Sequence, residues 1–198
     1  SDDGSSIVVG GFDKKVQLHM IKRGTELTTF RTTERTTVVR SCHLSCDSRY
    51  LAMGTELNGK GSALIWDART EMCEHTWPQS KPVWAVRFNV DAKLLAVGGF
   101  EMCVHLYRTT GDRDLLQTIK YTPLGGPAFI WSLNWSADGA RFIVGCWNQQ
   151  TFLYHVDPDA GDAEAECEEP LVQICCVKRS DRVYSVGLDA HGHNLVEM

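Results

Sequence analysis

One spacing recurs along the 198 residues of this chain. Five glycines each close a short apolar run, with steps of 44, 44, 47 and 42 residues between them: Gly10, Gly54, Gly98, Gly145 and Gly187. Five acidic residues precede these glycines, with steps of 44, 44, 47 and 43 residues: Asp3, Asp47, Asp91, Asp138 and Asp181. Because two independent markers keep the same period, the chain is built from repeated units of about 44 residues.

Residues 83–107 show what one unit contains. Apolar and polar positions alternate over residues 83–88, which predicts a strand with Trp84, Val86 and Phe88 on one face. A tight turn and two further strands follow. We expect a positive φ at Gly98 and Gly99, which end the second strand of the unit at residues 93–97.

Short strands joined by tight turns, with no helical periodicity, predict an all-β protein. A fourth, outer strand is expected in each unit, for example at residues 25–29 and 115–119. Units of about 40 to 45 residues with four short strands are typical of β-propeller blades. The approximate units of this chain are 1–30, 31–77, 78–120, 121–170 and 171–198.

The number of units is smaller than a closed propeller needs. At ~44 residues a blade, seven blades require about 308 residues, so this chain supplies about four and a half blades. An open arc of blades leaves strand edges uncovered, which natural proteins avoid. We therefore expect the chain to be part of a longer, seven-bladed propeller.

The residues that follow the repeat glycines share a pattern. It runs from the glycine to an aromatic residue or histidine nine positions later in residues 10–19, 98–107 and 145–154, and residues 66–67 are Trp-Asp. This resembles the pattern G-x-x-D-x-x-V-x-L-W-D of the WD-repeat family, along essentially the whole chain. The repeats are diverged: no Gly-His pair precedes a first strand, and only Thr55 offers a hydroxyl at the serine/threonine position. The resemblance implies WD-type blades that contact peptide or protein partners.

Two sets of equivalent positions are expected on one rim of such a propeller, near its central channel. Two residues after the repeat glycines stand Phe12, Glu56, Phe100, Trp147 and Asp189. At the entry to the first strands stand Arg40, Trp84, Trp131 and Ile174. Because aromatic residues and arginine carry much of the binding energy of protein interfaces, we predict a protein-binding site formed by Phe12, Arg40, Trp84, Phe100, Trp131 and Trp147. The alternative is that these side chains pack between blades.

These features predict a non-catalytic platform that binds peptide or protein partners in a larger assembly, without a small-molecule substrate or a cofactor. The sequence contains no G-x-S-x-G, no H-E-x-x-H and no P-loop. The alternative is an enzyme with a metal or acid/base site at Asp189, His191 and His193, because two histidines and a carboxylate can bind zinc or iron.

Charge and cysteine content narrow the setting. A net charge of -5 and scattered basic residues argue against nucleic-acid binding. No apolar run approaches the ~20 residues of a membrane-spanning helix, so no membrane insertion is expected. Eight cysteines without a C-x-x-C pair predict reduced thiols in a cytoplasmic or nuclear protein; a disulfide framework in an extracellular protein is the alternative.

Overall fold

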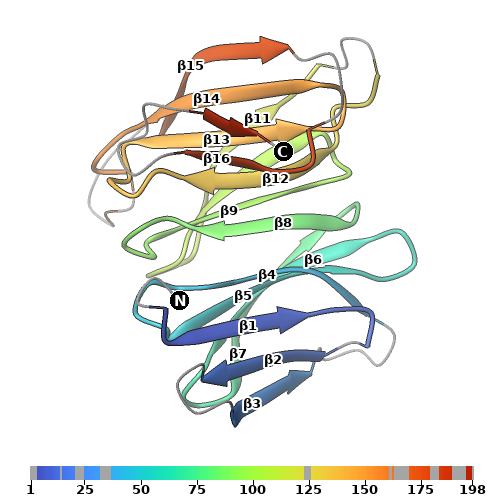
Figure 1. The fold of residues 1–198 in the computed structure, drawn as a ribbon, viewed down its shortest axis with the longest axis vertical. Coiled ribbons are helices and arrows are strands. Elements are labelled where there is room, and N and C mark those ends of the chain that lie inside the picture. Colours follow the sequence, from blue (N-terminus) through green and yellow to red (C-terminus); the bar gives the residue numbers. More distant parts are fainter. Residues whose placement is uncertain are drawn as a thin grey trace.

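A computed structural model describes residues 4–13, 15–20, 25–31, 37–122, 126–160, 162, 170–178, 183–188 and 195–197. These residues form 17 β-strands and no helix, arranged in five antiparallel sheets (Figure 1). The prediction of an all-β protein is therefore confirmed.

Three of the sheets have four strands each, in sequence order. The second sheet contains β4 (Val38–Leu44), β5 (Tyr50–Glu56), β6 (Gly61–Asp67) and β7 (Met72–Gln79). The third contains β8 (Val83–Phe88), β9 (Leu94–Gly99), β10 (Cys103–Arg108) and β11 (Leu115–Lys120). The fourth contains β12 (Ile130–Trp135), β13 (Arg141–Cys146), β14 (Gln150–Val156) and β15 (Leu171–Lys178). These are blades of the WD type.

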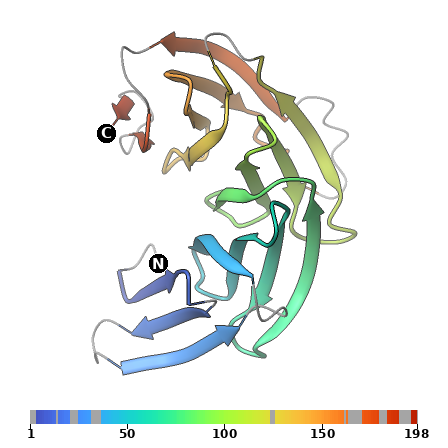
Figure 2. The ribbon, with the colours of Figure 1, turned by 90° about the vertical axis from the view of Figure 1, so that its right-hand side faces the viewer.

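The first and fifth sheets are smaller. The first contains β1 (Ser6–Gly10), β2 (Lys15–Met20) and β3 (Thr25–Arg31), and the fifth contains β16 (Val186–Leu188) and β17 (Leu195–Glu197). The outer strands predicted at residues 25–29 and 115–119 are present as β3 and β11. Figure 2 shows the blades as an arc, with β4, β8 and β12 toward its concave side and β7, β11 and β15 on its convex side. The total of seven blades stays a prediction.

The repeat glycines are explained by contact between neighbouring blades. A Cβ atom added to Gly98 would lie 2.5 Å from Ile130 Cγ2, and one added to Gly54 would lie 2.7 Å from Val83 Cγ1. Both contacts are to the inner strand of the next blade, and both are closer than real Cβ atoms come. The positive φ expected at Gly98 and Gly99 is wrong, because neither glycine has one. Glycine is needed at these positions because a side chain would not fit between the blades, and not because the backbone adopts an unusual conformation.

The recurring acids close the turns between the first and second strands. Asp47 Oδ1 accepts hydrogen bonds from Ser45 Oγ (2.6 Å) and from the Arg49 backbone N–H (3.0 Å). Asp138 Oδ1 makes the equivalent pair of bonds with Ser136 Oγ (2.5 Å) and the Ala140 N–H (2.9 Å). At Asp47 desolvation is the largest single influence and raises the pKa, but the hydrogen bonds from Ser45 and Arg49 outweigh it and the pKa is lowered. At Asp138 the bonds from Ser136 and Ala140 come first and lower the pKa of the carboxyl group. The acid therefore recurs because each turn needs an acceptor for its backbone.

Each hydrophobic core lies between two blades and not within one. The core between the second and third blades joins Ile65 and Trp77 to Val86 and Tyr107, and the Trp77 and Tyr107 rings stack 4.8 Å apart. Tyr107 replaces the tryptophan of the family pattern, and its hydroxyl accepts a hydrogen bond from Gln79 Nε2 (2.9 Å). The blades thus depend on their neighbours for burial, as repeat architectures do.

The last part of the chain differs from the sequence division. The strand β15 pairs with β14 as the outer strand of the fourth blade, whereas the sequence placed residues from 171 onward in the next unit. The strand β16 packs on β12 and β13 as β12 packs on β8 and β9, so β16 is an inner strand. Gly187 therefore lies in an inner strand and is not the equivalent of Gly98. Asp3 and Asp181 lie outside the described residues.

Candidate functional site

A β-bulge at the start of the inner strands sets the predicted rim positions. In β4, Val39 pairs with Thr55 and Ser41 with Gly54, so Arg40 has no partner in the ladder. The same shift between β8 and β9 leaves out Trp84, and the shift between β12 and β13 leaves out Trp131. A bulge residue is released from strand alternation and its side chain is turned toward the strand edge.

Because of the bulge, the prediction that Trp84 shares one face of β8 with Val86 and Phe88 is wrong. The sequence placed Trp84 on one face with Val86 and Phe88, as strict alternation requires. In the structure Val83, Val86 and Phe88 are in the core between the second and third blades, and Trp84 is only partly buried. The extra residue changes the phase of the strand after its first position, so Trp84 is not part of that core.

The tryptophans of successive blades contact one another along the rim. The Trp84 ring lies 4.2 Å from Phe100, in the hairpin of its own blade, and 4.3 Å from Trp131 of the next blade. Trp131 in turn lies 4.8 Å from Trp147, and both of these rings lie 5.8 Å from Tyr184. Most of these contacts are edge-to-face, the arrangement that the ring quadrupoles favour. We call Trp84, Phe100, Phe129, Trp131, Trp147 and Tyr184 the aromatic rim.

Arginine extends the aromatic rim toward the first blade. The Arg40 guanidinium lies 4.7 Å from the centre of the Phe12 ring and 5.6 Å from that of Trp84, within the range of cation–π attraction. Glu56 Oε2 accepts a hydrogen bond from Arg40 Nε (2.7 Å) and forms an ion pair with Arg40 Nη2 at 2.6 Å. The ion pair fixes the guanidinium plane between two aromatic rings, and Phe12 remains 71% exposed. All six predicted protein-binding residues therefore lie along one continuous surface; their role in binding stays a prediction.

A hollow of about 190 Å³ opens between Arg40, Trp84 and Trp131. The indole N–H of Trp84 is buried and has no hydrogen-bond partner among the described residues. An unsatisfied buried donor costs ~1–3 kcal/mol. The hollow combines two aromatic walls with a cation that Glu56 holds in place.

Three of the rim assignments made from the sequence need comment. Phe129 was not predicted, and its ring stacks on that of Phe100 with 4.3 Å between the ring centres. Tyr184 was not predicted either; it directly follows Val183, which packs on Gly145. Ile174, predicted at the entry to a first strand, lies half exposed in the outer strand β15, so that placement is wrong. The sequence analysis treated Gly187 as equivalent to Gly145, although Gly187 lies in an inner strand, and this placed Ile174 at a strand entry. Asp189 lies outside the described residues.

The described part of the chain contains one cluster of metal-type residues, and the predicted alternative cluster is not tested. Asp189, His191 and His193 lie outside the described residues. In the described part of the chain, Glu101, Cys103 and His105 bring three ligand atoms within 4.8 Å of one another. Burial, and then the nearby Glu101 carboxylate, raise the pKa of the Cys103 thiol to about 11. The sequence signal for this cluster was its alternation at positions 101, 103 and 105 around the start of β10.

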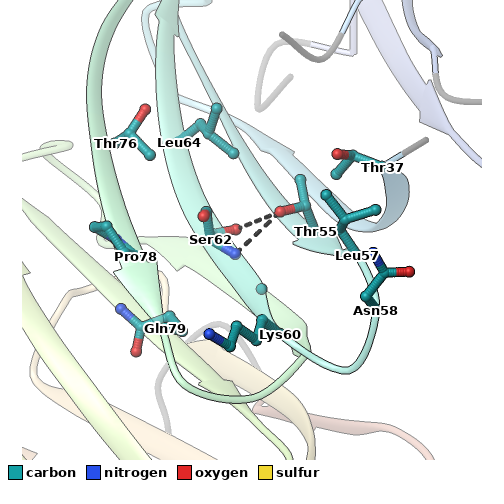
Figure 3. A pocket seen from close by; sticks show the side chains of 11 residues that line it. Thr37, Thr55, Leu57, Asn58, Lys60, Ser62, Leu64, Thr76, Pro78 and Gln79 are labelled. Atoms are coloured by element: carbon teal, nitrogen blue, oxygen red, sulfur yellow. Dashed lines mark hydrogen bonds between the residues drawn. The ribbon is translucent and has the colours of Figure 1, made fainter. Parts of the chain in front are cut away.

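A second hollow, of about 500 Å³, lies beside β6 and β7 (Figure 3). Its lining is mainly threonine, serine and amide side chains, and Lys60 is its only charged residue among those described. Thr55 Oγ1 donates to the Ser62 carbonyl and accepts from the Ser62 N–H, both at 3.0 Å (Figure 3). The described lining has no acid/base pair, so it provides no basis for a catalytic site.

Comparison with known protein families agrees with the fold. Residues 71–108 and 117–155 match the family described as "WD40: WD domain, G-beta repeat". The first match runs from β7 to β10 and the second from β11 to β14, so each starts in the outer strand of one blade and ends in the third strand of the next. The chain therefore contains two WD40 repeats, as the resemblance predicted, and its subfamily is not identified. A comparison with curated proteins gives no match.

WD40 repeats generally mediate protein–protein interactions, typically in scaffolds without enzymatic activity. This general property is compatible with a site made of aromatic side chains and one ion pair. Among the described residues there is no helix long and apolar enough to cross a membrane.

Proposed function

We propose that this chain is a non-catalytic interaction platform that binds a peptide or protein partner across the aromatic rim, within a larger assembly. The observation that carries the proposal is the continuity of the rim: each bulge residue contacts the bulge residue of the next blade, and most of them also contact the hairpin residue of their own blade. Side chains from several blades thus form one surface on a rigid support.

The hollow between Arg40, Trp84 and Trp131 indicates what the partner presents. A volume of about 190 Å³ with two indole walls accommodates one apolar side chain. Arg40 already supplies a cation held by Glu56, so an apolar anchor fits this hollow better than an arginine does. Buried aromatic pockets of this kind are where interface hot spots occur.

The test is affinity purification of the full-length protein from its native cells, with partners identified by mass spectrometry. Trp84→Ala and a combined Phe12→Ala, Phe100→Ala, Trp147→Ala variant are expected to lose the stoichiometric partner. Removal of a hot-spot residue costs ~2 kcal/mol or more, which corresponds to about 30-fold weaker binding. A thermal melt of each variant shows that it is folded.

The matched control is Leu115→Ala, because Leu115 is a half-exposed apolar residue on the outer strand β11, away from the rim. It should retain the partner at wild-type affinity. Folded rim variants that keep every partner would show that the rim does not bind. The seven described cysteines are free thiols, which supports a cytoplasmic or nuclear setting, and fractionation of the native cells tests that setting separately.

A further inference from the structure

We propose that Glu101, Cys103 and His105 bind one zinc ion at the junction of the second and third blades. Glu101 lies in the turn between β9 and β10, Cys103 is the first residue of β10, and His105 follows two positions later. Alternate residues of a strand project from the same face. Local chain geometry alone therefore brings a carboxylate, a thiol and an imidazole together.

The three ligand atoms lie within 4.8 Å of one another, and two of the three pairs have distances close to those of a zinc site. Cys103 Sγ lies 3.2 Å from His105 Nε2, and His105 Nε2 lies 3.3 Å from Glu101 Oε2. Zinc bonds of ~2.0–2.2 Å to oxygen or nitrogen and ~2.3 Å to sulfur place tetrahedral ligand atoms about 3.3–3.6 Å apart. Little movement is needed for the three atoms to form one face of a tetrahedron, with the fourth position open to water.

The groups behind the ligands hold them in the orientation that zinc requires. Thr118 Oγ1 lies 3.0 Å from His105 Nδ1, so a proton on Nδ1 leaves the Nε2 lone pair facing Cys103 and Glu101. Ser80 Oγ, in the connection between β7 and β8, donates to the other oxygen of Glu101. Hydrogen bonds of this kind to metal ligands fix the tautomer and the ring orientation.

A cavity of about 10 Å³ is lined by all three residues and by Gly98 and Gly99, which is the space of a single ion or water molecule. Cys103 is buried, and the other two side chains are mostly covered. A thiolate and a carboxylate balance the double charge of zinc. The neighbouring cations are Lys81, which lines the cavity, and Lys120, which is opposite Cys103 in the ladder.

The consequence of zinc binding is structural. Because Ser80 belongs to the connection between blades and bonds to Glu101, an ion held by Glu101 and β10 ties that connection to the third blade. A ligand that binds the folded state alone stabilises it by an amount that grows with the logarithm of the ligand concentration relative to its Kd. Zinc is therefore expected to raise the melting temperature of the full chain.

The first experiment measures zinc per chain by elemental analysis after dialysis against a weak chelator, and the melting temperature with and without added zinc. One zinc per wild-type chain and a higher melting temperature are expected. Cys103→Ser and His105→Gln should abolish both effects. Cys46→Ser is the matched control, because Cys46 is exposed in the turn after β4, and it should bind zinc as the wild type does.

Two milder variants keep the test informative if the first pair does not fold. Glu101→Gln retains the size of the side chain and removes its charge, and Thr118→Val removes only the partner of His105 Nδ1. Loss of such a partner typically weakens metal binding about 10- to 100-fold. Cobalt substituted into the wild type should show thiolate charge-transfer absorption, which zinc then removes because it binds more tightly.

A wild-type chain that takes up no zinc would overturn the proposal. So would zinc that is retained by both Cys103→Ser and His105→Gln but lost on the combined change His191→Gln and His193→Gln. That outcome would move the metal to the other histidine cluster. The result does not depend on the rim, since none of the three ligands belongs to it.

Discussion

His43, in β4, occupies a position where a positive charge is poorly tolerated. Its Nδ1 accepts a hydrogen bond from the backbone N–H of Phe88 (3.2 Å), which requires a neutral ring with its proton on Nε2. Burial, and then the nearby Arg87 guanidinium, lower the pKa of His43 to about 3. Protonation would remove the acceptor and place a second cation beside Arg87. The folded state therefore holds His43 neutral where the unfolded chain would bind a proton.

The sign of the pH effect follows from this difference. The unfolded imidazole titrates near pH 6.5, so the contribution of neutral His43 is complete above that pH and is lost as the pH falls toward 3. The free energy of unfolding should decrease by up to ~1.4 kcal/mol per pH unit below 6.5. Urea denaturation at pH 7, 6 and 5 measures the slope, and His43→Gln, which keeps an acceptor, should reduce it. The pKa of His75 is also lowered, by burial and then Arg113, so the slope should not vanish. An unchanged slope in His43→Gln would contradict the assignment.

Single residues of the rim were largely predictable, and their contacts were not. Counting two positions from each repeat glycine found Phe12, Phe100 and Trp147, because the hairpins keep the period. The bulge at Trp84 leaves no signature in one sequence, since one extra residue in a strand looks like a change of phase. The hollow beside Arg40 depends on side chains of three blades and could not be derived from spacing.

Among the elements, the second strand of a blade packs directly against the inner strand of the next blade. Gly145 in β13 repeats what Gly54 and Gly98 show: an added Cβ would lie 2.7 Å from Val186 and 3.0 Å from Val183. The backbone of the second strand is thus in direct contact with side chains of the next inner strand. The distance between blades is set by this contact.

Replacing Gly98 with alanine should therefore push β12 away from β9. The Cβ would overlap with Ile130, which is fully buried and cannot turn aside. Overpacking of this kind costs ~1–3 kcal/mol, and we expect Gly98→Ala to lower the free energy of unfolding by that amount in a urea titration. Gly11→Ala is the matched control, because its nearest neighbour would be 3.7 Å away and its φ is not positive. The control should be unchanged or slightly stabilised. Equal stability of the two variants would show that blade spacing does not require glycine at residue 98.

Most strands could be predicted from alternation and turn residues, from β4 to β14. The sequence analysis assigned β15 to the wrong blade, and this error has a physical reason. The sequence of β15 is largely apolar, like that of an inner strand, but it lies at the outside of a blade and seven of its eight residues are exposed. A run of apolar residues indicates a strand and does not show which edge of the blade the strand occupies. The position of β15 as the outer strand of the fourth blade is shown only by its pairing with β14.

For the molecule as a whole, packing between blades buries some of the described cysteines and leaves others exposed or partly buried. Cys46 and Cys175 are exposed, whereas Cys103 and Cys146 are buried. Burial raises the pKa of both buried thiols, and a thiol that keeps its proton reacts slowly with alkylating reagents. The arc of blades therefore protects its interior thiols even though it is open in Figure 2.

Alkylation of the native protein at pH 8, followed by peptide mass spectrometry, should modify Cys46 and Cys175 and spare Cys103 and Cys146. All four should react after denaturation in urea. Protection of Cys146 requires the fourth blade to pack on the third, because it belongs to the core between them. Rapid native labelling of Cys146 would therefore show that this junction opens.

The bulge at the head of each inner strand has a consequence for how such a surface can change over evolutionary time. Arg40, Trp84 and Trp131 differ in charge and shape, yet the ladder around each of them is the same. Because the inserted residue takes no part in pairing, its identity is decoupled from the framework that carries it. Substitutions at the bulge residues can therefore change the charge and shape of the rim one blade at a time, while the pairing of the strands stays the same.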